Sequence, residues 1–259
     1  MEENKGAAHQ ARNRAMFDAI ARRYDLLNRL LSAGVDRYWR RRLLVAAGRS
    51  KAGPVLDLAT GTADLAIGLC RFPEVKVVGV DAARAMLQRG RAKVQGRGLE
   101  DRIALLTADA ELLPFADGAF GLVTAAFGVR NFADPGAALA EAGRVLRPGG
   151  SLLVLEFSEP TAPLFRQVYR FYFSQVLPRL GRWISGHPEA YGYLPRSVSA
   201  FPQGPAFLAL LLKAGLVEAT ATRLTLGVCT LYEARRDGAA DCIDFPRRGF
   251  KPLALASQL

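Results

Sequence analysis

Three aspartates follow short apolar runs, and a parallel sheet would gather them at one edge. Asp57 lies in the first run, Asp81 closes the second, and Asp109 follows the third. Ligands of open α/β sheets bind in the crevice outside the carboxyl ends of the strands. A carboxylate accepts hydrogen bonds, so Asp81 suits a pair of ribose hydroxyls and Asp109 an adenine amino group. The three positions predict a site for one adenosine.

The turn after the first run holds a single glycine, Gly61, with Ala59, Thr62 and Ala63 around it. A dinucleotide site needs the spacing G-x-G-x-x-G here, because a pyrophosphate must approach bare backbone at a helix N-terminus. The turn therefore argues against NAD and favours a ligand without a pyrophosphate.

Each aspartate also has a structural interpretation. Asp57 would cap the glycine turn, Asp81 would cap the following helix, and Asp109 would be an ordinary loop residue. None of the three identifies a site alone, whereas their order at successive strand ends does.

Short apolar runs alternate with segments of helix length from residue 51 onward, as in βαβ units. Right-handed crossovers make such a sheet doubly wound. Only Thr225–Leu226 joins the last two runs, so the final strand must be antiparallel. We expect an α/β, Rossmann-like fold with a seven-stranded, mostly parallel sheet and an antiparallel last strand. The predicted strands are 54–58, 75–80, 102–106, 121–127, 151–157, 217–224 and 227–233, and the predicted helices are 64–71, 83–95, 135–145 and 205–214.

The chain divides into three parts. Residues 1–50 form a helical segment, with a helix over 12–32 and a short basic helix whose expected N-cap is Asp36. Residues 51–235 form the main domain, and residues 236–259 form a polar tail without periodicity.

The composition of the chain indicates a globular protein and shows which kinds of site and segment to expect. Half of the 259 residues are hydrophobic, which suits a sizeable core and excludes global disorder. Three dispersed cysteines and two histidines suggest no metal site and fit a reducing, cytoplasmic compartment. The N-terminus lacks the apolar segment of a signal peptide, and the run Ala206–Leu212 is too short to span a bilayer.

A net charge of +11 indicates an anionic partner, either nucleic acid or a membrane surface. An arginine-rich but merely solvated surface explains the charge equally well. The chain lacks an aromatic RNA-binding motif, a helix-turn-helix signature and a lysine-rich tail, so we expect no nucleic-acid partner. Nothing in the sequence indicates an oligomeric state.

Three blocks of sequence match a known family. They are Tyr24-Asp25-Leu26-Leu27-Asn28-x-x-Leu31-Ser32 with Trp39 downstream, Phe127-Gly128-Val129-Arg130-Asn131, and Arg144–Gly150 running into Leu155–Ser158. Over residues 16–235 the chain resembles the ubiquinone/menaquinone biosynthesis C-methyltransferases, a branch of the class I S-adenosylmethionine (SAM)-dependent methyltransferases. The first two blocks are specific to this family, and the third is common to many methyltransferases.

The resemblance implies that SAM is the cosubstrate. It implies that SAM is held by Thr62, Asp81, Asp109 and Ala110, and with these we include Asp57 and Gly61 of the glycine turn. Ala126 stands where the family usually has a serine that contacts SAM, so one hydroxyl contact is missing. Two further departures are Leu27 in place of methionine and Asp36 in place of histidine.

The resemblance also implies methyl transfer to a ring carbon of a prenylated hydroquinone, with demethylmenaquinol as the expected substrate and menaquinol as the product. Another small or lipid-like acceptor is the alternative. Loss of a phenolic proton activates the ring, so a base or a held water must reach the phenol. Arginine stays charged, so Arg130 would stabilise the phenolate or orient that water, while Asn131 would hold a quinol oxygen.

Three more residues enter this predicted chemistry. Tyr24 and Asp25 of the N-terminal helix would close a lid over the sulfonium, and Glu156 is an alternative base. The structural alternatives are an ion pair of Arg130 with Asp134 or Asp25, simple packing for Tyr24, and a buried structural role for Glu156.

Residues 161–202 are expected to be an insertion that faces substrate or membrane. Within it, aromatic and aliphatic residues from Phe165 to Trp183 recur every three or four positions, with arginines between them. A basic amphipathic helix of this kind is typical of a membrane surface and would suit a polyprenyl substrate. The alternative is a helix that covers the sheet. We therefore expect a cytoplasmic protein that binds the inner face of the membrane peripherally.

Overall fold

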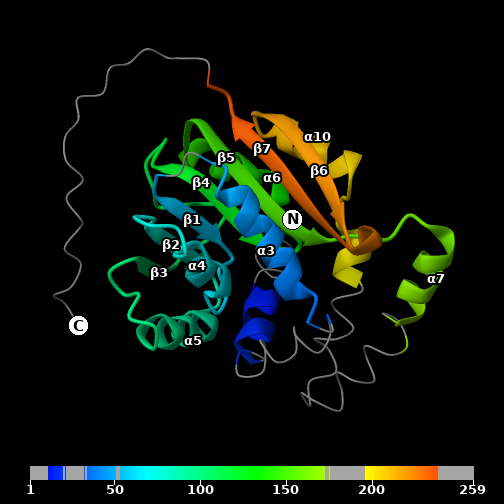
Figure 1. Cartoon of the computed structure of the whole chain (residues 1–259), viewed down its shortest axis with the longest axis horizontal. Coiled ribbons are helices and arrows are strands. Elements are labelled where there is room, and N and C mark those ends of the chain that lie inside the picture. The colour runs from blue at the N-terminus through cyan, green and yellow to red at the C-terminus, as the bar shows by residue number, and fades with distance from the viewer. Residues whose placement is uncertain are drawn as a thin grey trace.

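Seven strands form one sheet in the order β3-β2-β1-β4-β5-β7-β6 (Figure 1). In this computed structural model the described residues are 11–19, 21, 32, 34–50, 53–172, 175 and 196–238. The five strands from β1 through β5 are parallel to one another, and β7 is antiparallel to both of its neighbours, β5 and β6. The predicted α/β fold with an antiparallel last strand is therefore confirmed. The strands are β1 (Val55–Leu58), β2 (Val77–Asp81), β3 (Ile103–Thr107), β4 (Phe120–Ala126), β5 (Leu146–Phe157), β6 (Leu216–Leu224) and β7 (Cys229–Arg236).

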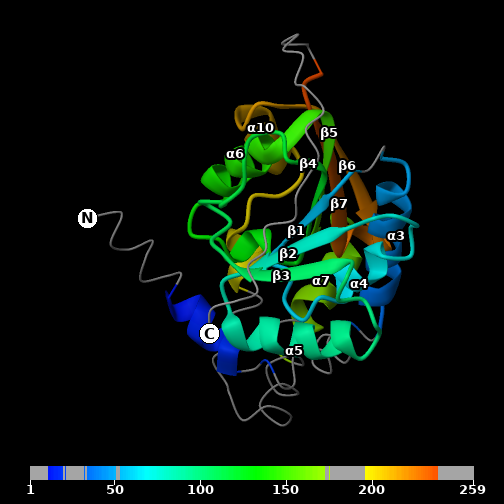
Figure 2. The same ribbon diagram turned by 90° about the vertical axis from the view of Figure 1, so that its left-hand side faces the viewer.

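Helices cover both faces of the sheet. The helices α6 and α10 lie on one side, and α3 and α4 lie on the other (Figure 2). Buried side chains form one large cluster on each face, as expected for strands that are apolar on both sides. The labelled helices are α3 (Asp36–Ala47), α4 (Asp64–Leu69), α5 (Arg84–Gln95), α6 (Pro135–Val145), α7 (Pro163–Phe171) and α10 (Pro205–Lys213), with the 3₁₀ turns η2 (Val129–Asn131) and η4 (Thr225–Gly227), and a further helix spans 11–19.

Strand register brings the predicted site together. Leu58 is level with Val80 of β2 and with Ala125 of β4, and Val80 is level with Leu106 of β3. The turns that follow these four parallel strands therefore leave the sheet at the same edge. This is the arrangement that an adenosine site at successive strand ends requires.

Some expected boundaries were wrong. β5 begins at Leu146 rather than at residue 151, because Leu146 already pairs with Phe120 before a register shift. The expected N-cap Asp36 is the first residue of α3, and Val35 holds the cap position without a side-chain hydrogen bond. Asp36 instead accepts a hydrogen bond from Ser32 Oγ at 2.9 Å.

Parts of three expected segments lie outside the described residues. Of the helix over 12–32, the structure describes a helix at 11–19. Of the long amphipathic helix, it describes α7, and Trp183 lies beyond the described part. The tail is described only as far as residue 238.

Candidate functional site

An open cavity of about 740 Å³, its solvent-exposed mouth included, lies at this edge of the sheet. Its walls come from the turns after β1, β2, β3 and β4 and from helix 11–19. Six of the predicted site residues line it together: Gly61, Asp81, Asp109, Ala110, Ala126 and Asn131.

Asp81 joins two of these turns. Its Oδ2 accepts a hydrogen bond from the Gly61 amide and its Oδ1 one from the Ala83 amide, both at 2.8 Å. Burial, with a smaller contribution from the nearby carboxylate of Asp18, raises the pKa of Asp81 to about 6. Each carboxylate oxygen has a second lone pair for a ribose hydroxyl. The helix-capping interpretation of Asp81 was wrong, because the N-cap of α5 is Ala83 and no side chain caps it, while Asp81 holds the turn before the helix and faces the cavity.

Backbone strain collects in the turns after β1 and β4. Ala59, Ala63 and Phe127 have positive φ angles of 49°, 65° and 62°, a region that non-glycine residues rarely occupy. A Cβ at Gly128 would lie 2.4 Å from the Cβ of Ala59, so the turns after β1 and β4 touch only because position 128 is glycine. Such strain is often found at ligand sites, where surrounding structure holds it in place.

Asp57 and Thr62 lie behind the turn and, in the part of the chain that the structure describes, do not line the large cavity. The two oxygens of Asp57 accept hydrogen bonds from Thr60 Oγ1 and Thr124 Oγ1, each at 2.7 Å. Burial raises the pKa of Asp57 to about 6. Thr62 Oγ1 accepts a hydrogen bond from Lys93 Nζ at 2.8 Å. Asp57 therefore braces the glycine turn, as its structural interpretation predicted.

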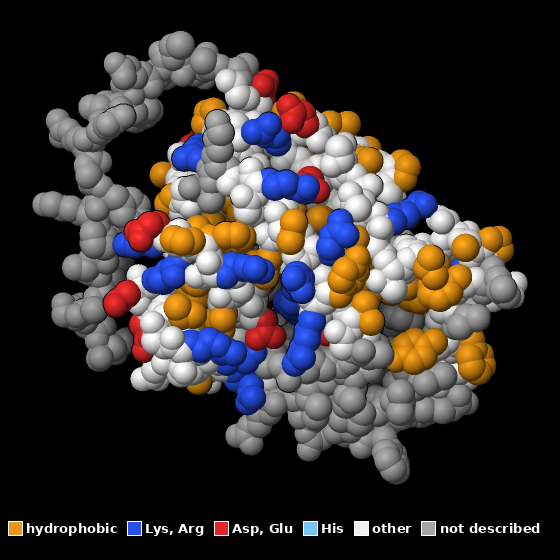
Figure 3. Space-filling model, viewed as in Figure 1, with side chains coloured by type: hydrophobic (Ala, Val, Ile, Leu, Met, Phe, Trp, Pro, Cys, Tyr) orange, Lys and Arg blue, Asp and Glu red, His pale blue; other side chains and the backbone are white. Residues whose placement is uncertain are grey.

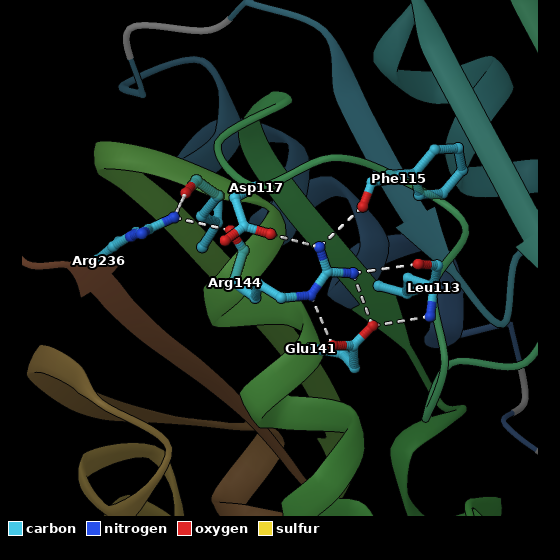
Figure 4. A network of polar contacts seen from close by, with 7 residues as sticks. Leu113, Phe115, Asp117, Glu141, Arg144 and Arg236 are labelled. Carbon is cyan, nitrogen blue, oxygen red and sulfur yellow. Dashed lines mark hydrogen bonds and ion pairs between the residues drawn. The ribbon is translucent and has the colours of Figure 1, made fainter. Parts of the chain in front are cut away.

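A network on α6 holds the loop that carries Asp109 (Figure 4). Arg144 donates to the carbonyls of Leu113 and Phe115 at 3.0 and 2.8 Å and to both carboxylate oxygens of Glu141. Glu141 in turn accepts from the Leu113 amide at 2.8 Å. Both side chains thereby fix the path of the chain between β3 and β4.

Helix 11–19 closes the cavity from above the strand ends. Asn13, Arg14 and Phe17 line it. Asn13 Nδ2 donates to the Asn131 carbonyl at 3.0 Å, and Asp18 Oδ1 accepts from the Ala85 amide at 2.8 Å, which places a carboxylate at the start of α5. The spacing of apolar residues predicted a helix here, but nothing in the sequence indicated that this helix would lie over the ends of these strands.

Arg130 has a different partner from those expected. Its Nη1 donates to Glu156 Oε2 at 2.9 Å and to the Phe127 carbonyl. The expected partner Asp134 instead caps α6, and Asp25 lies outside the described residues. Glu156 is fully buried, in agreement with a structural role.

The Arg130 side chain is 7% exposed and is not among the described residues that line the cavity. Its guanidinium lies 5.2 Å from the Phe157 ring centroid. Its Nε is buried and has no hydrogen-bond partner within the described ranges. Asn131 does line the cavity, and Tyr24 lies outside the described residues.

The residues present fit an adenosyl group. Asp81 and Asp109 supply acceptors, Gly61 and Gly128 allow close backbone approach, and Met86 with Ala83 and Phe132 forms an apolar wall for a flat ring. The described residues contain no group of three or more His, Cys, Asp or Glu side chains suited to a metal ion. Within the same ranges, no helix combines the length and the apolar character needed to cross a membrane.

Fold and site together define a class I SAM-dependent methyltransferase. Among solved structures, the chain is similar to a SAM-dependent methyltransferase of Thermotoga maritima (TM-score 0.58, 19% identity, 86% of this chain and 100% of that chain). It is also similar to phosphoethanolamine N-methyltransferase 2 of Haemonchus contortus (TM-score 0.58, 14% identity, 76% of this chain and 52% of that chain). These identities support the fold alone.

The chain belongs to the ubiE/COQ5 methyltransferase family, whose model matches residues 5–236. It is 53% identical to the demethylmenaquinone methyltransferase of Thermus thermophilus over 222 residues, which are 85% of this chain and 100% of the relative. It is 47% identical to the demethylmenaquinone methyltransferase of Deinococcus radiodurans over 89% of this chain and 93% of the relative. The match to the ubiquinone/menaquinone biosynthesis C-methyltransferase UbiE of Geobacter sp. strain M21 is 45% over 85% of this chain and 94% of the relative. The resemblance seen in the sequence blocks is confirmed.

Proposed function

We propose that this protein methylates a ring carbon of a prenylated hydroquinone and converts demethylmenaquinol into menaquinol. The observation that carries the substrate is the 53% identity to a demethylmenaquinone methyltransferase that is matched over its whole length. The cavity at the strand ends supports the cosubstrate half of the proposal. Another small or lipid-like acceptor is the alternative.

SAM supplies a methyl group bound to a positively charged sulfur. We assign its ribose to Asp81 and its adenine to Asp109 and Ala110, because these residues line the cavity at neighbouring strand ends. Gly61 and Ala126 line the wall between them and the glycine turn. Asp57 and Thr62 support this wall from behind through their hydrogen bonds to Thr60, Thr124 and Lys93.

The acceptor ring must be activated before it can take the methyl group. A phenolic proton leaves to a base or water, and the electron pair moves onto the ring carbon. That carbon forms the new bond to the methyl group while the carbon–sulfur bond breaks toward sulfur, leaving neutral S-adenosylhomocysteine (SAH). The proton on the methylated ring carbon then leaves, which restores the aromatic ring, and the ring oxygen takes up a proton to give the quinol. Alignment of the two reactants supplies much of the acceleration.

Asn131 and Arg130 are the residues we propose for this activation. Asn131 lines the cavity and would hold a quinol oxygen. Arg130 remains charged but does not line the cavity, so its guanidinium would stabilise the phenolate through space, from behind the residues that contact the acceptor. Glu156 holds Arg130 in place through the 2.9 Å ion pair. Tyr24 remains a candidate for the lid.

We also propose that the protein works at the inner face of the cytoplasmic membrane, where the prenyl tail of its substrate resides. Hydrophobic side chains gather at the side of the molecule where α7 lies (Figure 3). On α7, Phe171 is 63% exposed while Tyr169 is buried. An exposed aromatic ring and the exposed Arg166 on the same helix suit a headgroup boundary.

The test is an assay with purified protein, SAM carrying a deuterated methyl group, and demethylmenaquinol in detergent micelles. Mass spectrometry should find a product heavier by one deuterated methyl group, attached to ring carbon. Parallel reactions with a ubiquinone precursor and with a sterol measure selectivity. Methylation of the sterol without methylation of either quinol would overturn the proposal in favour of the alternative.

A further inference from the structure

The turn between β6 and β7 presents an exposed leucine at the edge of the sheet where the site lies. Cys229, the first residue of β7, is level with Phe157 at the end of β5 and with Leu224 at the end of β6. The turn that follows Leu224 therefore lies at the carboxyl end of β5, on the same edge as the turns that line the large cavity. Leu226, within this turn, is 69% exposed.

The backbone of this turn is strained. Thr225, Leu226 and Gly227 have consecutive positive φ angles of 48°, 56° and 93°. Glycine takes such angles freely, whereas a residue with a Cβ does so at a cost in free energy. Turns between antiparallel strands usually place asparagine, aspartate or glycine at such positions. Neither burial in the core nor the geometry of the turn accounts for a leucine at position 226.

The turn is fixed to the fold despite this strain. Trp39 Nε1 of α3 donates a hydrogen bond to Thr225 Oγ1 at 2.7 Å. Ser158 Oγ, just after β5, donates one to the Gly227 carbonyl at 2.8 Å. The Trp39 ring also packs against Phe127, which lines the large cavity, with 6.0 Å between the ring centroids. The exposed leucine is thus carried by a part of the fold that is packed directly against the wall of the site.

A basic side chain and a second apolar element flank the turn. Arg223 is exposed, and its Cδ lies 3.8 Å from where a Cβ on Gly227 would be. The Cα of Pro160 lies 3.4 Å from the same point, so the chain that leads from β5 into α7 passes beside the turn (Figure 1). On α7, Phe171 is 63% exposed. Exposed apolar side chains beside a cation suit the headgroup layer of an anionic bilayer.

We propose that the turn of Thr225–Gly227 is a membrane anchor that inserts the Leu226 side chain into an anionic bilayer. This inference rests on the membrane location proposed above and names the element that makes the contact. Insertion of this turn brings the carboxyl edge of the sheet to the lipid, which is where a prenylated acceptor resides. Because the turn is already fixed, binding needs little ordering of the chain.

The test is flotation of the full-length protein with phosphatidylcholine vesicles that contain or lack phosphatidylglycerol, without any quinol. Leu226→Asn removes the apolar side chain and supplies a residue that tolerates the left-handed backbone. We expect it to weaken binding to anionic vesicles by about tenfold, the size of partial burial of one leucine. Its SAH affinity should be unchanged and its melting temperature equal or higher, because the turn is less strained.

The matched control is Leu212→Asn. Leu212 lies on α10 and is 56% exposed, so the same apolar group is removed from the surface. It precedes Leu216, where β6 begins, and β6 begins at the opposite edge of the sheet from the turn. Leu212→Asn should leave vesicle binding unchanged.

Insertion is also measured directly with an environment-sensitive fluorophore on Leu226→Cys, in a Cys242→Ser background. The other two cysteines, Cys70 and Cys229, are buried. Lipids that carry a nitroxide on the acyl chain should quench this fluorophore strongly, and should quench one placed at Leu212→Cys little.

Vesicle binding by Leu226→Asn as tight as that of the parent protein would overturn the anchor. Equal weakening by Leu212→Asn, or equal quenching at the two labelled positions, would overturn it as well, because the contact would then not be made by this turn. A parent protein that binds no vesicles would overturn the anchor and the membrane location together. Methylation of demethylmenaquinol in micelles tests the reaction separately.

Discussion

At the scale of single residues, the site is built around carboxylates whose pKa values are raised. Asp81 faces the large cavity and Asp57 a second, smaller one, and burial raises the pKa of each to about 6. Both therefore change charge just below neutral pH. Neither is matched by a direct cationic hydrogen bond among the described residues, so a ligand that donates to them gains most when they are ionised.

SAM affinity should accordingly fall as the pH drops below about 6, because protonated Asp81 loses an acceptor for the ribose hydroxyls. The ligand-free protein should show the opposite contribution. A carboxyl group whose pKa rises from 3.8 to about 6 on folding binds more protons in the folded state, so its contribution to the free energy of unfolding decreases as the pH rises through this window. Calorimetry and denaturant unfolding between pH 5 and 8 measure both.

The control for this prediction is Asp81→Asn. It should bind SAM about tenfold or more weakly at pH 7, and the pH dependence of the remaining affinity should be shallower. SAM affinity that stays flat down to pH 5 in the unmodified protein would show that Asp81 is not the ribose acceptor.

Arg130→Met should reduce turnover about a hundredfold or more while SAH affinity changes little, because Arg130 acts on the acceptor and not on the adenosyl group. The variant leaves Glu156 buried without its partner, which lowers stability by about 3 kcal/mol. The double variant Arg130→Met with Glu156→Gln removes that charge and should regain stability but not turnover. Full turnover in either variant would remove Arg130 from the chemistry.

At the scale of elements, the local pattern of the chain was enough for the sheet but not for the contacts between distant segments. Alternating apolar runs and turn residues predicted all seven strands and the helices between them, because these signals act over a few residues. The ion pair of Arg130 with Glu156 joins residues 26 positions apart and depends on how β4 and β5 align. The contact of Asp18 with Ala85 spans 67 positions. No local pattern specifies either.

The site residues also divide into those that local sequence predicts and those whose position depends on contacts between distant segments. Gly61, Asp81 and Asp109 could be predicted because each belongs to a strand and the turn after it, and parallel strands place such turns together. The position of Arg40 could not be predicted, because Arg40 lines the second cavity, of about 300 Å³, only through the packing of α3 against the sheet.

The network on α6 yields a prediction about the Asp109 loop. Arg144→Met leaves the carbonyls of Leu113 and Phe115 without their donor and should lower the free energy of unfolding by about 2 kcal/mol. It should also weaken SAM binding, because the loop between β3 and β4 loses its anchor. Asp117→Asn is the control, since it removes one exposed ion pair of Arg144 and should change stability by less than about 0.5 kcal/mol. Equal stability of Arg144→Met and the parent protein would show that the network does not hold the loop.

At the scale of the whole molecule, the net charge of +11 is accompanied by a face on which basic and hydrophobic side chains are both exposed. Lys and Arg side chains run across the middle of the face that carries α3, and hydrophobic ones gather at the α7 side (Figure 3). The exposed arginines of α3 are Arg37, Arg41 and Arg42. Their charge favours an anionic layer, and each basic group near such a surface contributes about 1 kcal/mol.

Sedimentation with lipid vesicles tests this surface. Binding should require anionic lipid and weaken with added salt, because exposed charges are screened. Phe171→Ser should weaken it further by removing an exposed ring from α7. Equal binding to neutral and anionic vesicles would contradict an electrostatic membrane contact.

The central claim is that the strand ends hold SAM so that its methyl group reaches the ring of a prenylated quinol. The most direct measurement is the quinone pool of a bacterium that lacks its own quinone C-methyltransferase and expresses this protein. Lipid extracts should contain menaquinone in place of demethylmenaquinone, and Asp81→Asn, expressed at the same level, should restore much less. A pool that stays wholly demethylated, from cells whose purified protein still binds SAH, would contradict the assigned reaction.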